Sequence, residues 1–175
     1  VGFIALSRRD VSGDDRLVGP IFARSVWPLR SGESVDVPVF AGGFAAVEAE
    51  FVFRLAFDAP EGKLEWTAQE ALDLVAGLHF GIEMAGSPLA TINELGPTVV
   101  VSDFGNNAGV VLGPEIPGWR ERPENAMRCE THIDDELVGT GTAASVPGGL
   151  GAALAFALRR CASRVRRCYC RSRPS

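Results

Sequence analysis

The sequence predicts an α+β protein in which β-strands dominate, on three observations. Short apolar segments with alternating polar residues recur along the chain, and clusters of Gly, Pro, Asp and Asn separate them. Two or three stretches show the wider apolar spacing of helices. The 175 residues are 46% hydrophobic, which is enough to bury the core of one domain. We therefore expect a single domain over residues 1–158 and a separate tail over residues 159–175.

The first third of the chain predicts short strands followed by one long strand. Residues 1–45 read as short strands and loops, because Gly and Pro interrupt their apolar runs. The long strand covers residues 47–55, where the side chains alternate in character. One face carries Val47, Ala49, Phe51, Phe53 and Leu55, and the other carries Glu48, Glu50, Val52 and Arg54.

The remaining elements follow from caps, turns and apolar spacing. Thr67 and Glu70 form a capping-box pattern, which predicts a helix from Thr67 to about Leu78. Residues 79–84 then predict a strand, because they are apolar except for His79 and Glu83. Beyond it we expect a helical turn at 92–95, strands at 99–102 and 110–112, a hairpin of strands 129–133 and 136–142, and a helix at 150–158.

The charge is distributed unevenly and excludes some classes of partner. Residues 159–175 contain seven arginines and no acidic residue, whereas the preceding 158 residues hold ten basic and 22 acidic residues, a formal charge of −12. An acidic body argues against a nucleic-acid-binding domain, since phosphate contacts need Lys and Arg on the folded surface. No apolar run is long enough for a membrane span. We expect a soluble, cytoplasmic protein, with a tail that is either a disordered basic extension or a non-native, frame-shifted end.

Glu48 and Glu50 are the first candidate metal ligands. Because they are two residues apart in a predicted strand, their side chains share one face. Their like charges resist burial unless a cation lies between them. A hard divalent ion such as Mg²⁺ or Mn²⁺ prefers oxygen ligands of this kind. The alternative is a solvated strand face on which Arg54 is the partner of the acids.

Glu83 is the third candidate ligand. It is a single acid between Ile82 and Met84, in a segment with almost no other charge. A buried acid needs a compensating partner, so such a residue is a candidate for function. His79 would share its strand face, either as a hydrogen-bonding neighbour of a ligand or as an ordinary core histidine.

Four segments, in this order and spacing, resemble the 2-keto-4-pentenoate hydratase group of the fumarylacetoacetate hydrolase superfamily. They are VEAEFVFRL, LHFGIEMAGSPLA, VSDFGNNAGVVLGPEIPGW and GTGTAASVPGG, the last ahead of an Ala/Leu-rich helix. The resemblance covers residues 44 to about 158. It implies a mainly β fold of rolled mixed sheets with a few flanking helices, like the C-terminal domain of fumarylacetoacetate hydrolase, in a homodimer or larger homo-oligomer.

The resemblance also implies a site and a reaction. Mg²⁺ or Mn²⁺ would be held by Glu48, Glu50 and Glu83, and would stabilise the enolate of a short 2-oxo acid. Substrate contacts would come from Ser87, Asp103 and Asn107, although residues 103–107 taken alone read as an ordinary turn. The expected activity is hydration of a 2-hydroxydienoic acid such as 2-hydroxypenta-2,4-dienoate. Acylpyruvate hydrolysis and 2-oxo-acid decarboxylation, reactions of the same superfamily, are alternatives.

The chain departs from the family pattern near its N-terminus. Related hydratases carry a lysine in a Lys-Ile-Gly/Ala-Leu-like stretch, where this sequence reads Gly-Phe-Ile-Ala-Leu-Ser over residues 2–7. Lys63, the one lysine of the sequence, lies outside that motif, and the resemblance leaves Asp15 as the candidate catalytic residue. The family's last strands, expected after Leu158, are replaced by the Arg/Cys-rich tail, and the family's residues before Val1 are missing, so we expect a truncated or frame-shifted member of the family. A catalytically inactive remnant and a small β domain that binds a protein partner are further alternatives.

Overall fold

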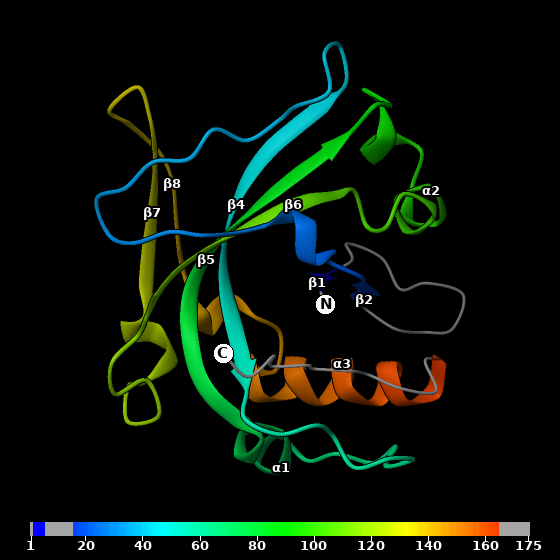
Figure 1. Ribbon diagram of the computed structural model, residues 1–175, viewed down its shortest axis with the longest axis vertical. Helices are drawn as coiled ribbons and strands as arrows, with labels where there is room; N and C mark the ends of the chain where they lie inside the picture. Colours follow the sequence, from blue (N-terminus) through cyan, green and yellow to red (C-terminus); the bar gives the residue numbers. More distant parts are fainter. Residues whose placement is uncertain (1, 6–15, 165–175) are drawn as a thin grey trace. The chain divides into compact units, whose positions relative to one another are not determined.

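The computed structural model describes residues 2–5 and 16–164, drawn in colour in Figure 1. Within these residues more of the chain lies in strands than in helices, and three segments are α-helices. The predicted α+β class is therefore confirmed. The rolled-sheet architecture implied by the family resemblance stays a prediction.

The chain forms two compact units. The first unit comprises residues 1–52 and 80–114, and the second comprises residues 53–79 and 115–175. Strands β4 (Phe44–Leu55) and β5 (Val75–Ser87) are 12 and 13 residues long, and each contributes to both units. Strands of this length are about twice the usual one, so a single strand can support two separate cores.

The first unit contains a short strand pair and the part of a larger sheet that matters for the site. β1 (Gly2–Ala5) pairs antiparallel with β2 (Arg16–Gly19). The larger sheet has the order β3-β6-β5-β4, in which β3 (Val26–Pro28) runs parallel to β6 (Asn107–Glu115). Strands β4, β5 and β6 of this sheet are labelled in Figure 1. β5 therefore has β4 on one side and β6 on the other, and a side chain on β5 can meet partners from both neighbours.

The helix α2 (Pro97–Ser102) corrects our prediction of a strand at residues 99–102. The run of valines has high β-propensity, but Pro97 occupies the first helical position and Gly96 precedes it with φ 89°. The backbone N–H of Val100 donates to the carbonyl of Gly96, which closes the first turn. The nearby turn at residues 92–95 is confirmed as the 3₁₀ helix Ile92–Glu94.

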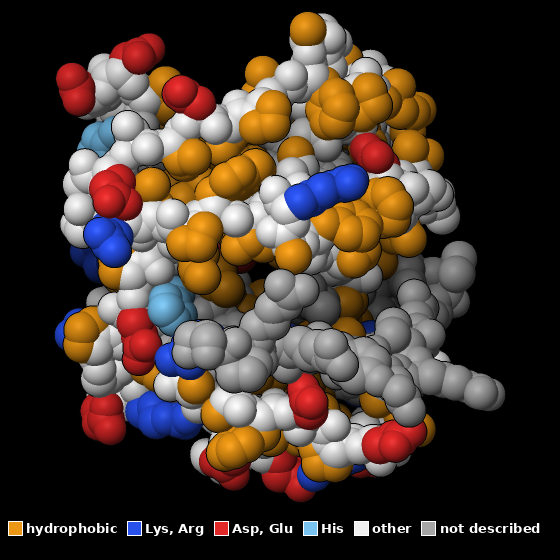
Figure 2. Space-filling view, viewed as in Figure 1, with side chains coloured by type: hydrophobic (Ala, Val, Ile, Leu, Met, Phe, Trp, Pro, Cys, Tyr) orange, Lys and Arg blue, Asp and Glu red, His pale blue; other side chains and the backbone are white. Residues whose placement is uncertain are grey.

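The first unit exposes much apolar surface. Its buried hydrophobic residues include Met84, Ile92 and Val110, yet many of its other large apolar side chains remain in contact with solvent. Figure 2 shows hydrophobic side chains gathered over the upper part of the visible face. In the described part of this unit the large exposed ones are Phe22, Val39, Phe40, Val47, Phe80, Ile82, Leu89, Leu95, Val101 and Phe104.

The second unit is built on two helices, α1 (Ala68–Asp73) and α3 (Gly149–Arg164). The predicted capping box at Thr67 and Glu70 is present, but α1 ends at Asp73 with Leu74 as its C-cap, so the prediction of a helix to Leu78 is wrong. The next residue, Val75, begins β5, where its side chain is buried in strand geometry. The core between the helices comprises Ala71, Ala155 and Leu158, with Leu55, Ala59, Trp66, Leu74 and Leu154 packed against them.

The predicted hairpin is also confirmed in this unit. β7 (Arg128–Ile133) pairs antiparallel with β8 (Glu136–Thr142), and Ile133 lies opposite Glu136. Asp134 and Asp135 form the two-residue turn with φ 50° and 64°, as a tight hairpin with the right-handed strand twist requires. Three more 3₁₀ segments complete the description: Ala23–Ser25 in the first unit, and Glu124–Ala126 and Ala143–Ser145 in the second.

The helix α3 confirms the prediction at residues 150–158 and continues past it to Arg164. The first six residues of the expected tail are therefore helical, and the remainder lies outside the described residues. In the described part of the chain, no helix combines the length and the apolar character that a membrane span needs.

Candidate metal centre

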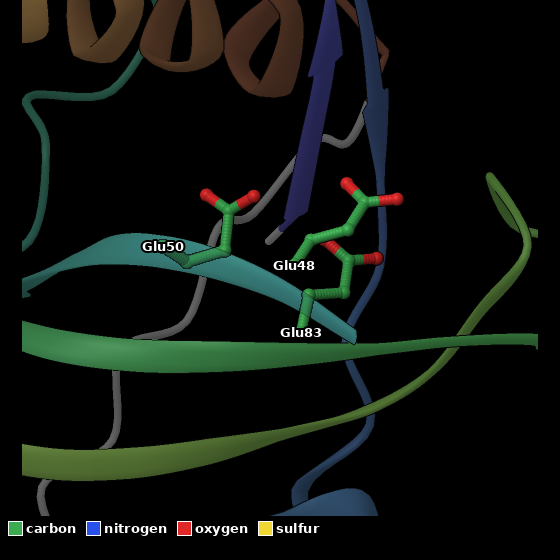
Figure 3. Close-up of side chains that lie close together, drawn as sticks. All are labelled: Glu48, Glu50 and Glu83. Carbon is green, nitrogen blue, oxygen red and sulfur yellow. The ribbon is translucent and has the colours of Figure 1, made fainter. Parts of the chain in front are cut away.

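Three glutamates of the first unit meet on one side of the sheet. Glu48 and Glu50 come from β4 and Glu83 comes from β5. Each contributes one carboxylate oxygen to a group in which all three oxygens lie within 4.8 Å of one another. Figure 3 shows the three side chains on the same side of the two strands. The structure thus brings together the three residues that the sequence predicted as metal ligands.

Strand geometry explains this convergence. The two-residue period of β4 puts Glu48 and Glu50 on the same face, and the neighbouring strand β5 supplies Glu83. Gly81 lies two residues before Glu83 and therefore on the same face of β5. A Cβ atom there would lie 2.6 Å from Cγ2 of Val52 and 3.7 Å from Cβ of Glu50, so the β4 side chains occupy the space that a larger residue would need.

The electrostatics of the cluster are unfavourable without a cation. Burial, and after it the negative charges of Glu83 and Glu48, together raise the pKa of Glu50 to about 8. A carboxyl group in this position is largely protonated at neutral pH, which is the usual response of an acid that is desolvated beside other acids. A cation beside the Glu50 carboxyl group would therefore stabilise its ionised form.

Glu83 is the most deeply placed of the three, with 5% of its surface exposed. Burial raises the pKa of its carboxyl group, and the charge of Glu48 adds to the effect. A hydrogen bond opposes this shift: the side-chain amide of Asn107 at the start of β6 donates to Oε1 of Glu83 at 2.8 Å. Glu83 therefore has a neutral polar partner on one side and two acids on the other.

The donor set fits a hard divalent cation. It consists of carboxylate oxygens alone, which suit Mg²⁺ or Mn²⁺ rather than a softer metal that prefers sulfur or imidazole. A doubly charged ion would offset the repulsion that raises the pKa of Glu50. This acidic cluster could therefore bind a metal ion.

The other predicted site residues have different positions. Ser87, with 1% of its surface exposed, ends β5, and its hydroxyl accepts a hydrogen bond from the backbone N–H of Leu89 at 3.1 Å. Asp103 follows α2, and its buried Oδ2 has no hydrogen-bond partner among the described residues. Asp15 lies outside the described residues. Substrate contacts by any of these residues stay predictions.

Two residues have surroundings that the sequence did not reveal. His79 belongs to the second unit, where its Nε2 lies 3.9 Å from Oε2 of Glu115. Asn107, which the family resemblance places on the substrate, is hydrogen-bonded to Glu83 in the structure. No sequence signal distinguishes these two roles for Asn107, because it lies 24 positions after Glu83 and only the folded sheet brings the two side chains together.

Comparison with known proteins adds no assignment. No protein-family model matches the chain, and no curated protein matches it significantly. The resemblance to the hydratase group therefore depends on the four sequence segments alone.

Proposed function

We propose that this protein is a divalent-metal-dependent enzyme of the hydratase type that acts on a short 2-oxo or 2-hydroxydienoic acid, such as 2-hydroxypenta-2,4-dienoate. The observation that carries the proposal is the convergence of Glu48, Glu50 and Glu83 within 4.8 Å. The choice of substrate class depends on the resemblance of the four sequence segments to the hydratase group. Acylpyruvate hydrolysis and 2-oxo-acid decarboxylation remain the chemical alternatives.

The three glutamates would hold Mg²⁺ or Mn²⁺ through their carboxylate oxygens. When bound, the cation supplies Lewis-acid stabilisation of the negative charge that develops on the enolate of a 2-oxo acid. The protein's own contribution is to present three carboxyl groups from two adjacent strands close together. The Asn107 amide holds the innermost of the three acids through its hydrogen bond.

A catalytically inactive metal-binding relative is the second candidate. The absence of a lysine at the position where the hydratase group has one favours it. Residues 2–7 contain no lysine where the hydratase group has one. Lys63, the single lysine of the chain, is already engaged in the second unit: its Nζ lies 2.5 Å from Oε1 of Glu70 and 4.4 Å from the centre of the Trp66 ring. It is therefore held in a structural contact around α1.

Thermal unfolding with and without Mn²⁺ or Mg²⁺, and with oxalate as an enolate mimic, tests the metal site. We expect a rise in melting temperature with metal and a further rise with oxalate, because ligands that bind the folded state stabilise it. A cooperative melt that neither metal shifts would overturn the metal site and with it the proposed function.

Activity assays separate the remaining alternatives. Turnover of a hydroxydienoate supports the hydratase, and turnover of an acylpyruvate or decarboxylation of a 2-oxo acid supports the corresponding alternative. Metal and oxalate binding without turnover of any of these compounds would favour the inactive relative. The experiment uses the full chain, with the buffer stripped of metal before each addition.

A further inference from the structure

Asn107 connects two features that the sequence analysis treated separately, the turn at residues 103–107 and the acidic cluster. Its Nδ2 donates to Oε1 of Glu83 at 2.8 Å and also points at the backbone carbonyl of Gly109 at 3.5 Å. The two hydrogens of the amide nitrogen are thus both directed at protein oxygens. The side-chain oxygen, an acceptor, is what remains for any ligand.

This hydrogen-bond pattern is unsuited to direct recognition of an acidic substrate. A 2-oxo acid presents carboxylate and carbonyl oxygens, which need donors, and an acceptor oxygen would repel them. The same pattern suits a different task. A donor on one oxygen of Glu83 fixes the rotation of its carboxyl plane and leaves lone pairs of the carboxylate for a cation.

The backbone before Asn107 is held in place from several directions. Phe104, Gly105 and Asn106 have φ values of 53°, 77° and 51°, a left-handed run that is costly for Phe104. The amide N–H of Gly105 donates to the carbonyl of Val100 at 2.7 Å, and the carbonyl of Asn106 accepts from the N–H of Gly86 at 2.7 Å. These hydrogen bonds fix the loop that delivers Asn107.

A second asparagine in the same loop provides a contrast. Asn106 is buried, and its Nδ2 donates to Oδ1 of Asn93 at 3.3 Å, within the loop region and away from the acids. Asn93 belongs to the 3₁₀ segment Ile92–Glu94 and is itself exposed. The Asn93–Asn106 contact thus stabilises the loop without touching a carboxylate of the cluster.

We propose that Asn107 is a positioning residue of the metal centre, which orients the carboxylate of Glu83 to receive a divalent cation. The proposal depends on the proposed function, because it takes Glu83 to be a metal ligand. It assigns Asn107 to the ligand rather than to the substrate. Partners that orient a metal ligand typically contribute 10- to 100-fold to metal affinity.

Titration of the full chain with Mn²⁺ alone, followed by isothermal calorimetry or by the electron paramagnetic resonance of free Mn²⁺, tests the proposal. We expect Asn107→Leu, which removes the donor at similar volume, to weaken the Mn²⁺ Kd 10- to 100-fold at a temperature well below its melt. Asn107→Gln, which keeps the donor on a longer side chain, should recover part of this loss. Asn93→Ala is the matched control and should lower the melting temperature while leaving the Kd within about twofold.

The outcomes separate this proposal from the one on which it depends. No Mn²⁺ binding by the unsubstituted chain overturns both. Binding that Glu50→Gln abolishes but Asn107→Leu leaves unchanged overturns the positioning role alone. An equal loss of affinity in Asn93→Ala also overturns it, because the effect would then belong to the loop as a whole. If Asn107→Leu shows no cooperative melt, Asn107→Ser, whose hydroxyl is too short to reach Glu83, takes its place with the same expected loss.

Discussion

Two glutamates of this chain show how strongly surroundings determine the behaviour of one side chain. In the first unit, burial and two neighbouring acids raise the pKa of Glu50 to about 8. In the second unit, hydrogen bonds from Lys63 and from the backbone and side chain of Thr67 lower the pKa of the exposed Glu70 to about 2. Glu70 has its positive partner, Lys63, built into the fold, whereas burial and the two neighbouring acids all act to raise the pKa of Glu50. The difference indicates that Glu70 is a structural residue, whereas the cluster that contains Glu50 could bind a metal ion.

The largest expected effect is on stability as a function of pH in metal-free protein. Between about pH 4.5 and pH 8 the folded chain keeps a proton on Glu50 that the unfolded chain has lost, so the free energy of unfolding should fall as the pH rises. Each pH unit of a displaced pKa corresponds to about 1.4 kcal/mol, so we expect a loss of several kcal/mol over this window. The lowered pKa of Glu70 has the opposite consequence: the ionised carboxylate stabilises the fold at neutral pH, and this contribution is lost as the pH falls below about 4.5.

Urea unfolding at pH 5, 6.5 and 8, in a chelator and then in excess Mg²⁺, measures this dependence. Mg²⁺ should restore the stability lost at pH 8, because the ion binds the ionised carboxylates. The variant Glu50→Gln should have a flatter pH profile in the chelator. Stability that stays level or rises from pH 5 to pH 8 in the unsubstituted, metal-free chain would contradict the raised pKa of Glu50.

The next effect concerns removal of one candidate ligand. At a Mn²⁺ concentration about 100 times its Kd, the unsubstituted chain should gain roughly 2.7 kcal/mol of stability, and Glu50→Gln should gain almost none. Glu94→Gln is the matched control, since Glu94 is an exposed acid of the same unit outside the cluster. Equal stabilisation of all three proteins by Mn²⁺ would show that the ion binds elsewhere.

A smaller effect on stability is expected when the helix cap that holds Glu70 is removed. Thr67→Ala removes the side-chain acceptor for the backbone N–H of Glu70 and should lower the free energy of unfolding by about 1 kcal/mol. Thr67→Ser keeps the hydroxyl and should behave almost like the unsubstituted chain. Chemical denaturation at pH 7 compares the two, and an identical loss in both would show that the methyl group, not the cap, matters.

The smallest effect is expected for the exposed ion pair between Arg54 and Glu115. Its atoms lie 3.6 Å apart, and the two side chains are 58% and 48% exposed. Solvent screens such a pair, so Arg54→Ala should change stability by less than about 0.5 kcal/mol. A double-mutant cycle with Glu115→Ala at low and high salt measures the pair, and a coupling above about 1 kcal/mol would contradict this ranking.

Much of the fold could be predicted because the decisive signals are local. The alternation in residues 47–55, the capping box at Thr67 and the Asp134-Asp135 turn each depend on neighbours within a few residues. The errors came where local preference and context disagree. Three valines favour a strand at 99–102, yet Pro97 and its flanking glycine start a helix there. The end of α1 at Asp73 and its C-cap Leu74 carry no Gly or Pro, so the apolar spacing beyond them favours a longer helix than the structure has.

The candidate site also combines features that local sequence predicts with features that depend on the order of strands in the sheet. Glu48 and Glu50 share a face because of the two-residue period of a strand, which can be predicted from the sequence alone. Glu83 stands out as an acid in an apolar segment, although its place beside β4 depends on sheet order. The contact of Asn107 with Glu83 could not be predicted, because it depends on β5 and β6 being neighbours and on the left-handed backbone that precedes Asn107.

The glycine at position 81 has a consequence for any screen of random substitutions in this protein. Its missing side chain leaves the space that Val52 fills, 2.6 Å from where a Cβ would stand. Replacement of Gly81 by alanine, which adds a single methyl group, must therefore displace the Val52 side chain or the backbone that carries it, although it alters no charge and removes no donor. In a library sorted by ion affinity, Gly81 should tolerate fewer replacements than residues that carry charge, and a neutral alanine there should be recovered among the losses.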